Sequence, residues 1–152
     1  MYGKLYLVST PIGNLEDLTF RAVKILSSVD IILAESVERT KKLLSHYEID
    51  GKVISFNKDN EKRKTKDVIA HLKNSKNIAL VSDAGTPSIS DPGFYLLSNI
   101  DERIKIIPIP GVSSITCALS VSKIPMNGFT FLGFLPKNCL LYTSDAADDT
   151  RS

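Results

Sequence analysis

The chain has 152 residues, of which 43% are hydrophobic and 24% charged, a composition typical of one globular α/β-sized domain with a buried core. Its net charge of +2 is too small to indicate nucleic-acid binding by itself, and no apolar run reaches the roughly 18 residues that a membrane-spanning helix needs. The two cysteines, Cys117 and Cys139, have neither metal-site spacing nor a disulfide framework, so we expect a cytoplasmic protein with no bound metal.

Short apolar segments alternate with amphipathic ones along the whole chain. In chain order we expect a strand at residues 4–9, a helix at 19–26, a strand at 31–34, a helix at 37–46, a strand at 52–56, a helix at 64–73, a strand at 78–81, a helix at 94–99, a strand at 104–107 and a helix at 113–122. This alternation favours the α/β class, with an open, mostly parallel sheet covered by helices on both faces.

Three loops rich in glycine and proline follow strands, at residues 10–14, 82–93 and 108–111. The carboxyl ends of parallel strands meet at one edge of a sheet, and ligands bind beyond that edge. The sequence therefore predicts that these loops lie together and form the functional site.

The loop at residues 82–93 is the most informative of the three. Glycines at 85 and 93 permit a positive φ and the close approach of a ligand to the backbone. Pro92 is predicted to open the next helix, with Asp91 or Ser90 as its cap. The composition of this loop thus fits a ligand-binding loop, and it fits about equally well a capped turn between a strand and a helix that binds no ligand.

Several common catalytic and binding motifs are absent from the sequence. No strand is followed by the glycine pattern of a dinucleotide site, and no phosphate-binding P-loop occurs. His46 and His71 are isolated on predicted helices, where surface positions are expected. Cys117 falls within a predicted helix and is expected to be a small core residue.

Four segments carry a resemblance to a known family. They are residues 8–15 (VSTPIGNL), 81–93 (VSDAGTPSISDPG), 107–111 (IPIPG) and 133–137 (GFLPK). Together they resemble the tetrapyrrole-methylase-like (class III) methyltransferases, and the resemblance covers residues 4–138. The first two segments are most similar to the branch that 2′-O-methylates a cytidine ribose in small-subunit ribosomal RNA, because tetrapyrrole methylases have a more glycine-rich first loop.

The resemblance implies an enzyme of two domains with S-adenosylmethionine between them. Residues 1–124 would form the cofactor-binding domain and residues 125–138 the start of a truncated second domain, so this half alone is expected to be inactive. The small-subunit ribosomal RNA, or the 30S subunit, would be the partner of an intact homodimer. The residues expected to contact the cofactor are Pro11, Ile12, Gly13, Asp83, Ala84, Gly85, Thr86, Pro87, Gly111, Ser113 and Ser114.

Methyl transfer to a ribose hydroxyl requires positioning and benefits from a nearby base, but needs no metal or covalent nucleophile. Glu35, at the end of the second strand, is the candidate base, although a solvated carboxylate is an equally good interpretation. Members of the family usually have Ala-Glu-Asp-Thr-Arg here, whereas this chain has Ser36 in place of the aspartate and its arginine one residue later, at Arg39. This departure leaves open whether and how the segment contacts the RNA or the acceptor ribose.

Basic residues are frequent in two segments, one in the helix predicted at 37–46 and one in the helix predicted at 64–73 and the polar loop before it. They would form one phosphate-binding surface if the helices were adjacent, and are otherwise solvated helix faces. The residues are Arg39, Lys41 and Lys42 in one segment and Lys58, Lys62, Arg63, Lys64 and Lys66 in the other. Two other functions stay open: a methylase acting on a small tetrapyrrole, which would need a large apolar cleft, and a folded cofactor-binding domain without activity.

The end of the chain differs in character from the rest. From Cys139 it reads CLLYTSDAAD, the translation of a transposon-end adapter used in sequencing libraries. An acidic disordered terminus is the alternative. We expect residues 139–152 to be foreign to the protein and to make no packed contact with the domain.

Overall fold

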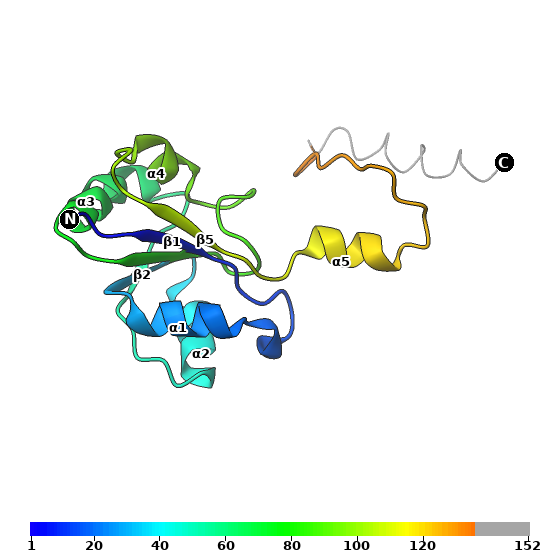
Figure 1. The fold of residues 1–152 in the computed structure, drawn as a ribbon, viewed down its shortest axis with the longest axis horizontal. Helices are drawn as coiled ribbons and strands as arrows, with labels where there is room; N and C mark the ends of the chain where they lie inside the picture. Colours follow the sequence, from blue (N-terminus) through cyan, green and yellow to red (C-terminus); the bar gives the residue numbers. More distant parts are fainter. Residues whose placement is uncertain (136–152) are drawn as a thin grey trace.

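The computed structural model describes residues 1–135 and contains one open sheet (Figure 1). Its strands are β1 (Leu5–Val8), β2 (Ile31–Ala34), β3 (Val53–Ser55), β4 (Ile78–Val81) and β5 (Ile106–Ile109). They lie in the order β3-β2-β4-β1-β5, and every neighbouring pair is parallel. The predicted α/β class and parallel sheet are confirmed.

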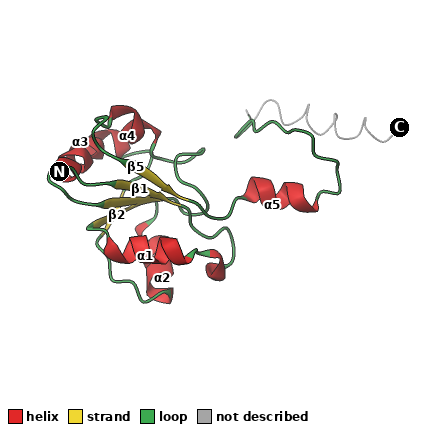
Figure 2. Cartoon of the chain, in the orientation of Figure 1, coloured by secondary structure: helices red, strands yellow, loops and turns green. Residues whose placement is uncertain are grey.

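Helices cover both faces of this sheet (Figure 2). On one face lie α1 (Phe20–Ser28) and α2 (Val37–His46), and on the other lie α3 (Glu61–Lys73) and α4 (Phe94–Asn99). A 3₁₀ turn, η1 (Leu15–Asp17), links β1 to α1. The Thr19 hydroxyl accepts a hydrogen bond from the amide of Ala22 and so caps α1, which extends two residues beyond its predicted end.

The central strands are apolar at every position because each of their faces is covered. In β2, Ile31 and Leu33 pack against α3, whereas Ile32 and Ala34 pack beneath α1 and α2. All four residues of β2 are buried. This alternation creates two hydrophobic cores, one on each side of the sheet, as expected for strands with helices above and below them.

The fifth strand lies two residues later than predicted, at Ile106–Ile109, and includes Pro108. The carbonyls of Lys105 and Ile109 accept hydrogen bonds from the amides of Leu5 in β1 and of Ser9 just after it, so Pro108 faces the open side of this edge strand. A proline lacks an amide hydrogen, and an edge strand tolerates it where no partner strand follows. The prediction of a turn beginning at Pro108 was therefore wrong.

The start of one helix and the cap of another differ from prediction, although α4 (Phe94–Asn99) has its predicted bounds. Helix α3 begins at Glu61 rather than at residue 64, because a turn closed by hydrogen bonds between Asn57 and Asn60 leads directly into it. Helix α4 begins after Pro92, at Phe94, and neither predicted cap forms. Gly93 precedes it with a φ of 128°, which is incompatible with a helix, and its amide donates to the Glu61 carboxylate at 3.0 Å.

Helix α5 (Ser114–Val121) forms close to its predicted position but does not pack on the sheet. Residues 112–135, which we call the arm, lead away from the body formed by residues 1–111 (Figure 1). Cys117 is consequently exposed, and its predicted place in the core was wrong. The predicted division into residues 1–124 and 125–138 stays a prediction, and residues 139–152 lie outside the described residues.

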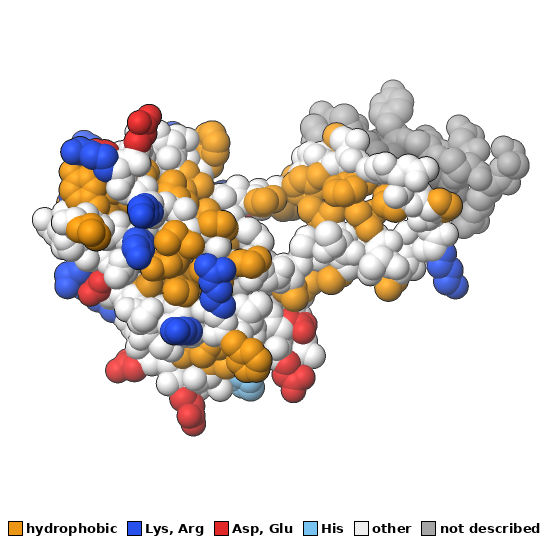
Figure 3. Space-filling model, viewed as in Figure 1, with side chains coloured by type: hydrophobic (Ala, Val, Ile, Leu, Met, Phe, Trp, Pro, Cys, Tyr) orange, Lys and Arg blue, Asp and Glu red, His pale blue; other side chains and the backbone are white. Residues whose placement is uncertain are grey.

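None of the helices in the described residues is both long enough and apolar enough to cross a membrane. The arm nevertheless exposes many apolar side chains, and Figure 3 shows them gathered on its visible face. The most exposed of them are Val121, Ile124, Phe129, Phe131, Leu132 and Phe134.

Candidate active site at the carboxyl edge of the sheet

The three glycine- and proline-rich loops meet at the carboxyl edge of the sheet, as predicted. Thr10 and Gly85 exchange two backbone hydrogen bonds of 3.0 Å and form an isolated antiparallel bridge between the first two loops. The hydroxyls of Ser9 and Thr86 lie 2.8 Å apart. The third loop joins them at Gly111, where an added Cβ would lie 2.7 Å from the Cβ of Ser9.

The loop after β4 has an unusual backbone. Gly85 has a φ of 79°, a value of the kind that a glycine permits, and the non-glycine residues Ser88 and Ser90 have φ values of 68° and 60°. Such conformations are uncommon in residues with a side chain and concentrate at functional sites. The sequence could indicate Gly85 but not the two serines, because any residue with a short polar side chain is compatible with many turns.

A pocket of about 340 Å³ opens beside these loops, within the roughly 300–1,000 Å³ range of ligand pockets. Six of its lining residues were predicted to contact a cofactor: Ile12, Ala84, Gly85, Thr86, Ser113 and Ser114. The prediction missed five others: Ile89, Asp91, Val112, Ile115 and Phe131. Asp91 belongs to the Ser-Asp-Pro-Gly stretch at residues 90–93. The sequence predicts Asp91 or Ser90 as a helix cap, whereas Asp91 lines the pocket.

The remaining predicted residues lie around this pocket rather than in it. Pro11 and Asp83 line a neighbouring hollow of about 200 Å³. Pro87 is buried beneath its loop, and Gly111 packs against Ser9. Gly13 and Glu35 line neither of these two hollows. The structure thus places the predicted residues at one edge of the sheet but divides them into a lining set and a supporting set.

Asp83 connects the loop to the start of α2. One of its carboxylate oxygens accepts the backbone amide of Ser36 at 3.0 Å, and the other lies 3.6 Å from the Arg39 guanidinium. Both oxygens therefore have a partner at the amino-terminal end of α2. The free backbone amides at that end of a helix favour a nearby negative charge.

Ser36, which replaces the aspartate usual in this family, caps the same helix. Its hydroxyl accepts the amide of Arg39 at 3.4 Å, the hydrogen bond that an aspartate in that position would also accept. The departure of this segment from the family pattern therefore preserves the local structure. Arg39, one residue later than in the family pattern, reaches the Asp83 carboxylate.

Asp91 is the single ionisable residue among the described residues that line the 340 Å³ pocket. Burial raises the pKa of its carboxyl, and the positive charge of Lys58 and a hydrogen bond with Ser82 partly offset that rise. The negative charge of Asp83 raises the pKa further. Because burial raises the pKa of Asp91, its carboxylate accepts a proton more readily than an exposed aspartate does.

The basic residues do not form one surface. Leu43 and Leu44 of α2 pack in one core and Val68 and Leu72 of α3 pack in the other, so the two helices lie on opposite faces of the sheet. Some of the cations are also engaged individually. The Lys64 ammonium donates to the Ser55 carbonyl at 2.6 Å.

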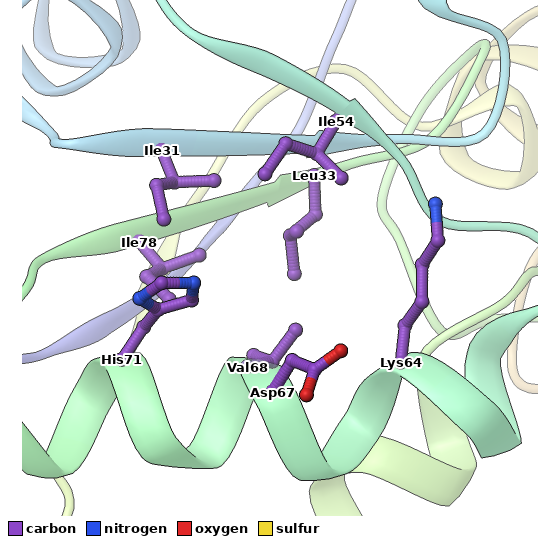
Figure 4. A pocket seen from close by; sticks show the side chains of 8 residues that line it. All are labelled: Ile31, Leu33, Ile54, Lys64, Asp67, Val68, His71 and Ile78. Carbon is purple, nitrogen blue, oxygen red and sulfur yellow. The ribbon is translucent and has the colours of Figure 1, made fainter.

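A second hollow, of about 150 Å³, lies between α3 and the strands (Figure 4). Aliphatic side chains from β2, β3 and β4 form one wall, and His71 and Asp67 of α3 lie opposite them. It lies against the middle of the strands rather than at the carboxyl edge. His46 is exposed on α2, and within residues 1–135 no three His, Cys, Asp or Glu side chains are grouped as a metal site would require.

A sequence profile of the tetrapyrrole (corrin/porphyrin) methylases matches residues 4–140, which is most of the chain. The chain belongs to this family. The solved structures of similar fold include the uroporphyrin-III-C-methyltransferase from Thermus thermophilus, with a TM-score of 0.57 and 23% identity over 84% of this chain and 56% of that one. A conserved hypothetical protein from Aeropyrum pernix K1 has a TM-score of 0.64 and 18% identity over 86% of this chain and 46% of that one. At such identities the likeness concerns the fold alone.

Sequence relatives are much more similar. The proteins named ribosomal RNA small subunit methyltransferase I from Buchnera aphidicola subsp. Baizongia pistaciae and from Halalkalibacterium halodurans are 53% and 51% identical to this chain. These matches cover 88% and 89% of this chain, but 46% and 47% of the relatives. A relative of the same name from Thermotoga maritima is 49% identical over 89% of this chain and 61% of its own length. The chain thus spans about half the length of the first two relatives.

Proposed function

We propose that this chain forms the S-adenosylmethionine-binding half of an enzyme that methylates the 2′-oxygen of a cytidine ribose in small-subunit ribosomal RNA. The observation that carries this proposal is the pocket at the carboxyl edge of the sheet. Loop residues distant in sequence line it together, namely Ile12, the segment 84–86 and the pair Ser113 and Ser114.

The residues that line the pocket suit this cofactor. Ile12, Ile115 and Phe131 offer apolar surface to an adenine ring, and the hydroxyls of Ser113 and Ser114 offer hydrogen bonds to polar groups. An ideal Cβ on Gly85 would point at the Ile12 side chain, 3.6 Å from its nearest methyl, so this glycine leaves room beside the backbone. S-adenosylmethionine supplies a methyl group on a positively charged sulfur.

The supporting residues keep the loops in place. Pro11, Gly13, Pro87 and Gly111 shape the loops around the pocket, while Asp83 ties the loop after β4 to α2. Because the methyl group is already activated, the residues of this chain contribute by orienting the reactants and excluding water. Positioning of this kind accounts for roughly 7–11 kcal/mol of a barrier in favourable cases.

The proposed substrate rests on the relatives. Proteins named for small-subunit ribosomal RNA are 49–53% identical to this chain, whereas the solved uroporphyrin methylase is 23% identical. We therefore favour RNA over a small tetrapyrrole as the methyl acceptor. The proposal includes a cytoplasmic setting on the 30S subunit and a homodimer for the intact protein, both of which follow from the resemblance described above.

Methyl transfer by the full-length protein tests this proposal. Radiolabelled S-adenosylmethionine should deliver its methyl group to small ribosomal subunits that lack the modification, and digestion of the RNA should return the label as 2′-O-methylcytidine. Uroporphyrinogen III is the matched alternative acceptor. Label on the porphyrinoid and none on RNA would contradict the proposed substrate, and label on neither would contradict the assignment as a methyltransferase of this kind.

A further inference from the structure

Three carboxylates lie near the carboxyl edge of the sheet, and their surroundings differ. Asp83 is engaged on both oxygens by α2, through Ser36 and Arg39. Glu35 follows β2 but lines neither hollow at this edge. Asp91 alone among them lines the 340 Å³ pocket, together with Gly85 and Thr86. Asp91 is therefore the one of the three positioned to meet a reactant inside that pocket.

The backbone around Asp91 holds this carboxylate in place. Ser90 before it has a φ of 60°, and Pro92 after it is buried. Gly93 has a φ of 128° and donates its amide to Glu61 of α3, while an ideal Cβ there would lie 2.8 Å from Leu80. This segment is thus fixed between the core and α3, an arrangement that preorganises a catalytic group.

Lys58 is the cation whose charge reaches Asp91. Its positive charge acts on the Asp91 carboxyl, and it belongs to the loop between β3 and α3. A lysine at this place can neutralise a phosphate of an incoming RNA strand. Asp91 therefore lines the proposed cofactor pocket and also feels the charge of a cation suited to the RNA backbone.

We propose that the Asp91 carboxylate is the general base that accepts the hydroxyl proton of the methyl acceptor, an inference that rests on the function proposed above. As the ribose oxygen forms its bond to the methyl carbon, the carbon–sulfur bond breaks and its electron pair stays on sulfur. The hydroxyl proton passes to the Asp91 carboxylate, which later releases it to water. Atoms and charge balance, because a cationic sulfonium becomes a neutral thioether as one proton is released.

The charged groups around Asp91 influence its pKa and therefore the pH dependence of the methyl-transfer rate. They are Lys58 from the loop after β3, Asp83 from the loop after β4 and Glu61 from α3, with Arg39 paired to Asp83. Burial outweighs Lys58, so the carboxyl loses its proton at a higher pH than an exposed aspartate does. The rate should rise with pH through that pKa and then reach a plateau.

The test compares Asp91→Asn, Asp91→Glu and Glu35→Gln in the full-length protein, with Asp67→Asn, at an exposed position of α3, as the control for loss of a negative charge. Three quantities are measured: single-turnover methyl transfer to small ribosomal subunits from about pH 4, near the usual aspartate pKa, to about pH 8.5, affinity for S-adenosylhomocysteine by calorimetry, and thermal unfolding. We expect Asp91→Asn to slow transfer by about 10²–10⁴-fold, to abolish the acidic limb of the profile and to leave affinity within about threefold. Asp91→Glu should recover part of the rate.

Unfolding separates this role from a structural one. A buried carboxyl with a raised pKa destabilises the folded protein once the pH exceeds that pKa, so Asp91→Asn should unfold at the same temperature or higher near pH 7. The proposal is overturned if Asp91→Asn transfers methyl at nearly the wild-type rate, if its affinity falls as much as its rate, or if Glu35→Gln removes the acidic limb instead. A wild-type protein that methylates no RNA would refute the proposed function rather than the role of Asp91.

Discussion

The body buries most of the apolar side chains of its strands, whereas the arm leaves most of its apolar side chains exposed. In the body, the strands bury residues such as Leu5, Ile78 and Leu80 on one face and Val8 and Ala79 on the other. In the arm, α5 buries none of its residues. Each Å² of apolar surface removed from water stabilises a fold by about 25 cal/mol. This burial therefore stabilises the body, whereas it contributes almost nothing to the stability of α5. Within the described residues, the chain thus contains a packed core and a helix, α5, that has no packing partner.

This difference matters for the site because the pocket draws on both regions. The body supplies Ile12 and residues 84–86, which are fixed by the bridge between Thr10 and Gly85. The arm supplies Ser113, Ser114 and Phe131. One wall of the pocket is therefore determined by the sheet, and the other depends on how the arm is held.

The largest expected effect compares two leucines. Leu80→Ala in β4 removes a side chain that is 1% exposed and should lower the free energy of unfolding by about 2–5 kcal/mol. Leu119→Ala in α5 removes one that is not buried and should change it by less than about 0.5 kcal/mol. Urea denaturation of the 152-residue chain measures both. Equal costs would mean that the arm packs as the body does.

A glycine in the pocket should have the next largest effect. Gly85→Val places a β-branched side chain at a φ of 79° and directs it toward Ile12, so the affinity for S-adenosylhomocysteine should fall at least about 100-fold, or about 2.7 kcal/mol. Gly128→Val in the arm, where an added Cβ meets nothing within 4 Å, is the matched control. Calorimetry on the full-length protein, with circular dichroism to monitor folding, measures the change. Full affinity in a folded Gly85→Val protein would show that the loop does not contact the cofactor.

A smaller effect is expected at Asp83. Asp83→Ala leaves the half-buried Ser36 amide without its acceptor and removes the partner of Arg39, so the free energy of unfolding should fall by about 1–2 kcal/mol. The affinity for S-adenosylhomocysteine should change by less than for Gly85→Val, because both carboxylate oxygens face α2. Measuring the two quantities side by side distinguishes support from direct contact. A large loss of affinity at unchanged stability would assign Asp83 to the cofactor.

The smallest effect concerns the exposed thiol of the arm. Cys117→Ser should alter the free energy of unfolding by less than about 0.5 kcal/mol, since the side chain lies in solvent. In the native 152-residue chain, Cys117 should also react with iodoacetamide as fast as in urea, as peptide mapping can measure. Strong protection of this thiol would indicate that α5 is packed.

Much of the body could be predicted because local patterns and tertiary packing agree there. The apolar runs at residues 31–34 and 78–81 are strands at those bounds, since helices cover both of their faces. Predictions failed where distant contacts decide the outcome. Pro108 became part of a strand because β5 is an edge, and Cys117 is exposed because α5 has no partner among the described residues. Neither fact is encoded in the neighbouring residues.

The candidate site was predictable to a similar extent and for the same reason. The glycine- and proline-rich loops after strands identified its location, and the positive φ of Gly85 is one that its residue type permits. The division between residues that line the pocket and residues that support it could not be foreseen. It depends on the orientation of side chains such as Asp83 and Asp91, and the partners of Asp83 lie at the start of α2, far away in the sequence.

Hydrogen exchange in the full-length protein, with and without S-adenosylmethionine, tests most directly whether the carboxyl-edge pocket holds the cofactor. Mass spectrometry would compare peptides covering residues 10–14, 82–93 and 111–116 with peptides covering α3, which borders the apolar hollow of Figure 4. We expect protection of the three loop segments and unchanged exchange in residues 61–73. Protection confined to residues 61–73, with the loops unaffected, would place the ligand in the other hollow and contradict the account.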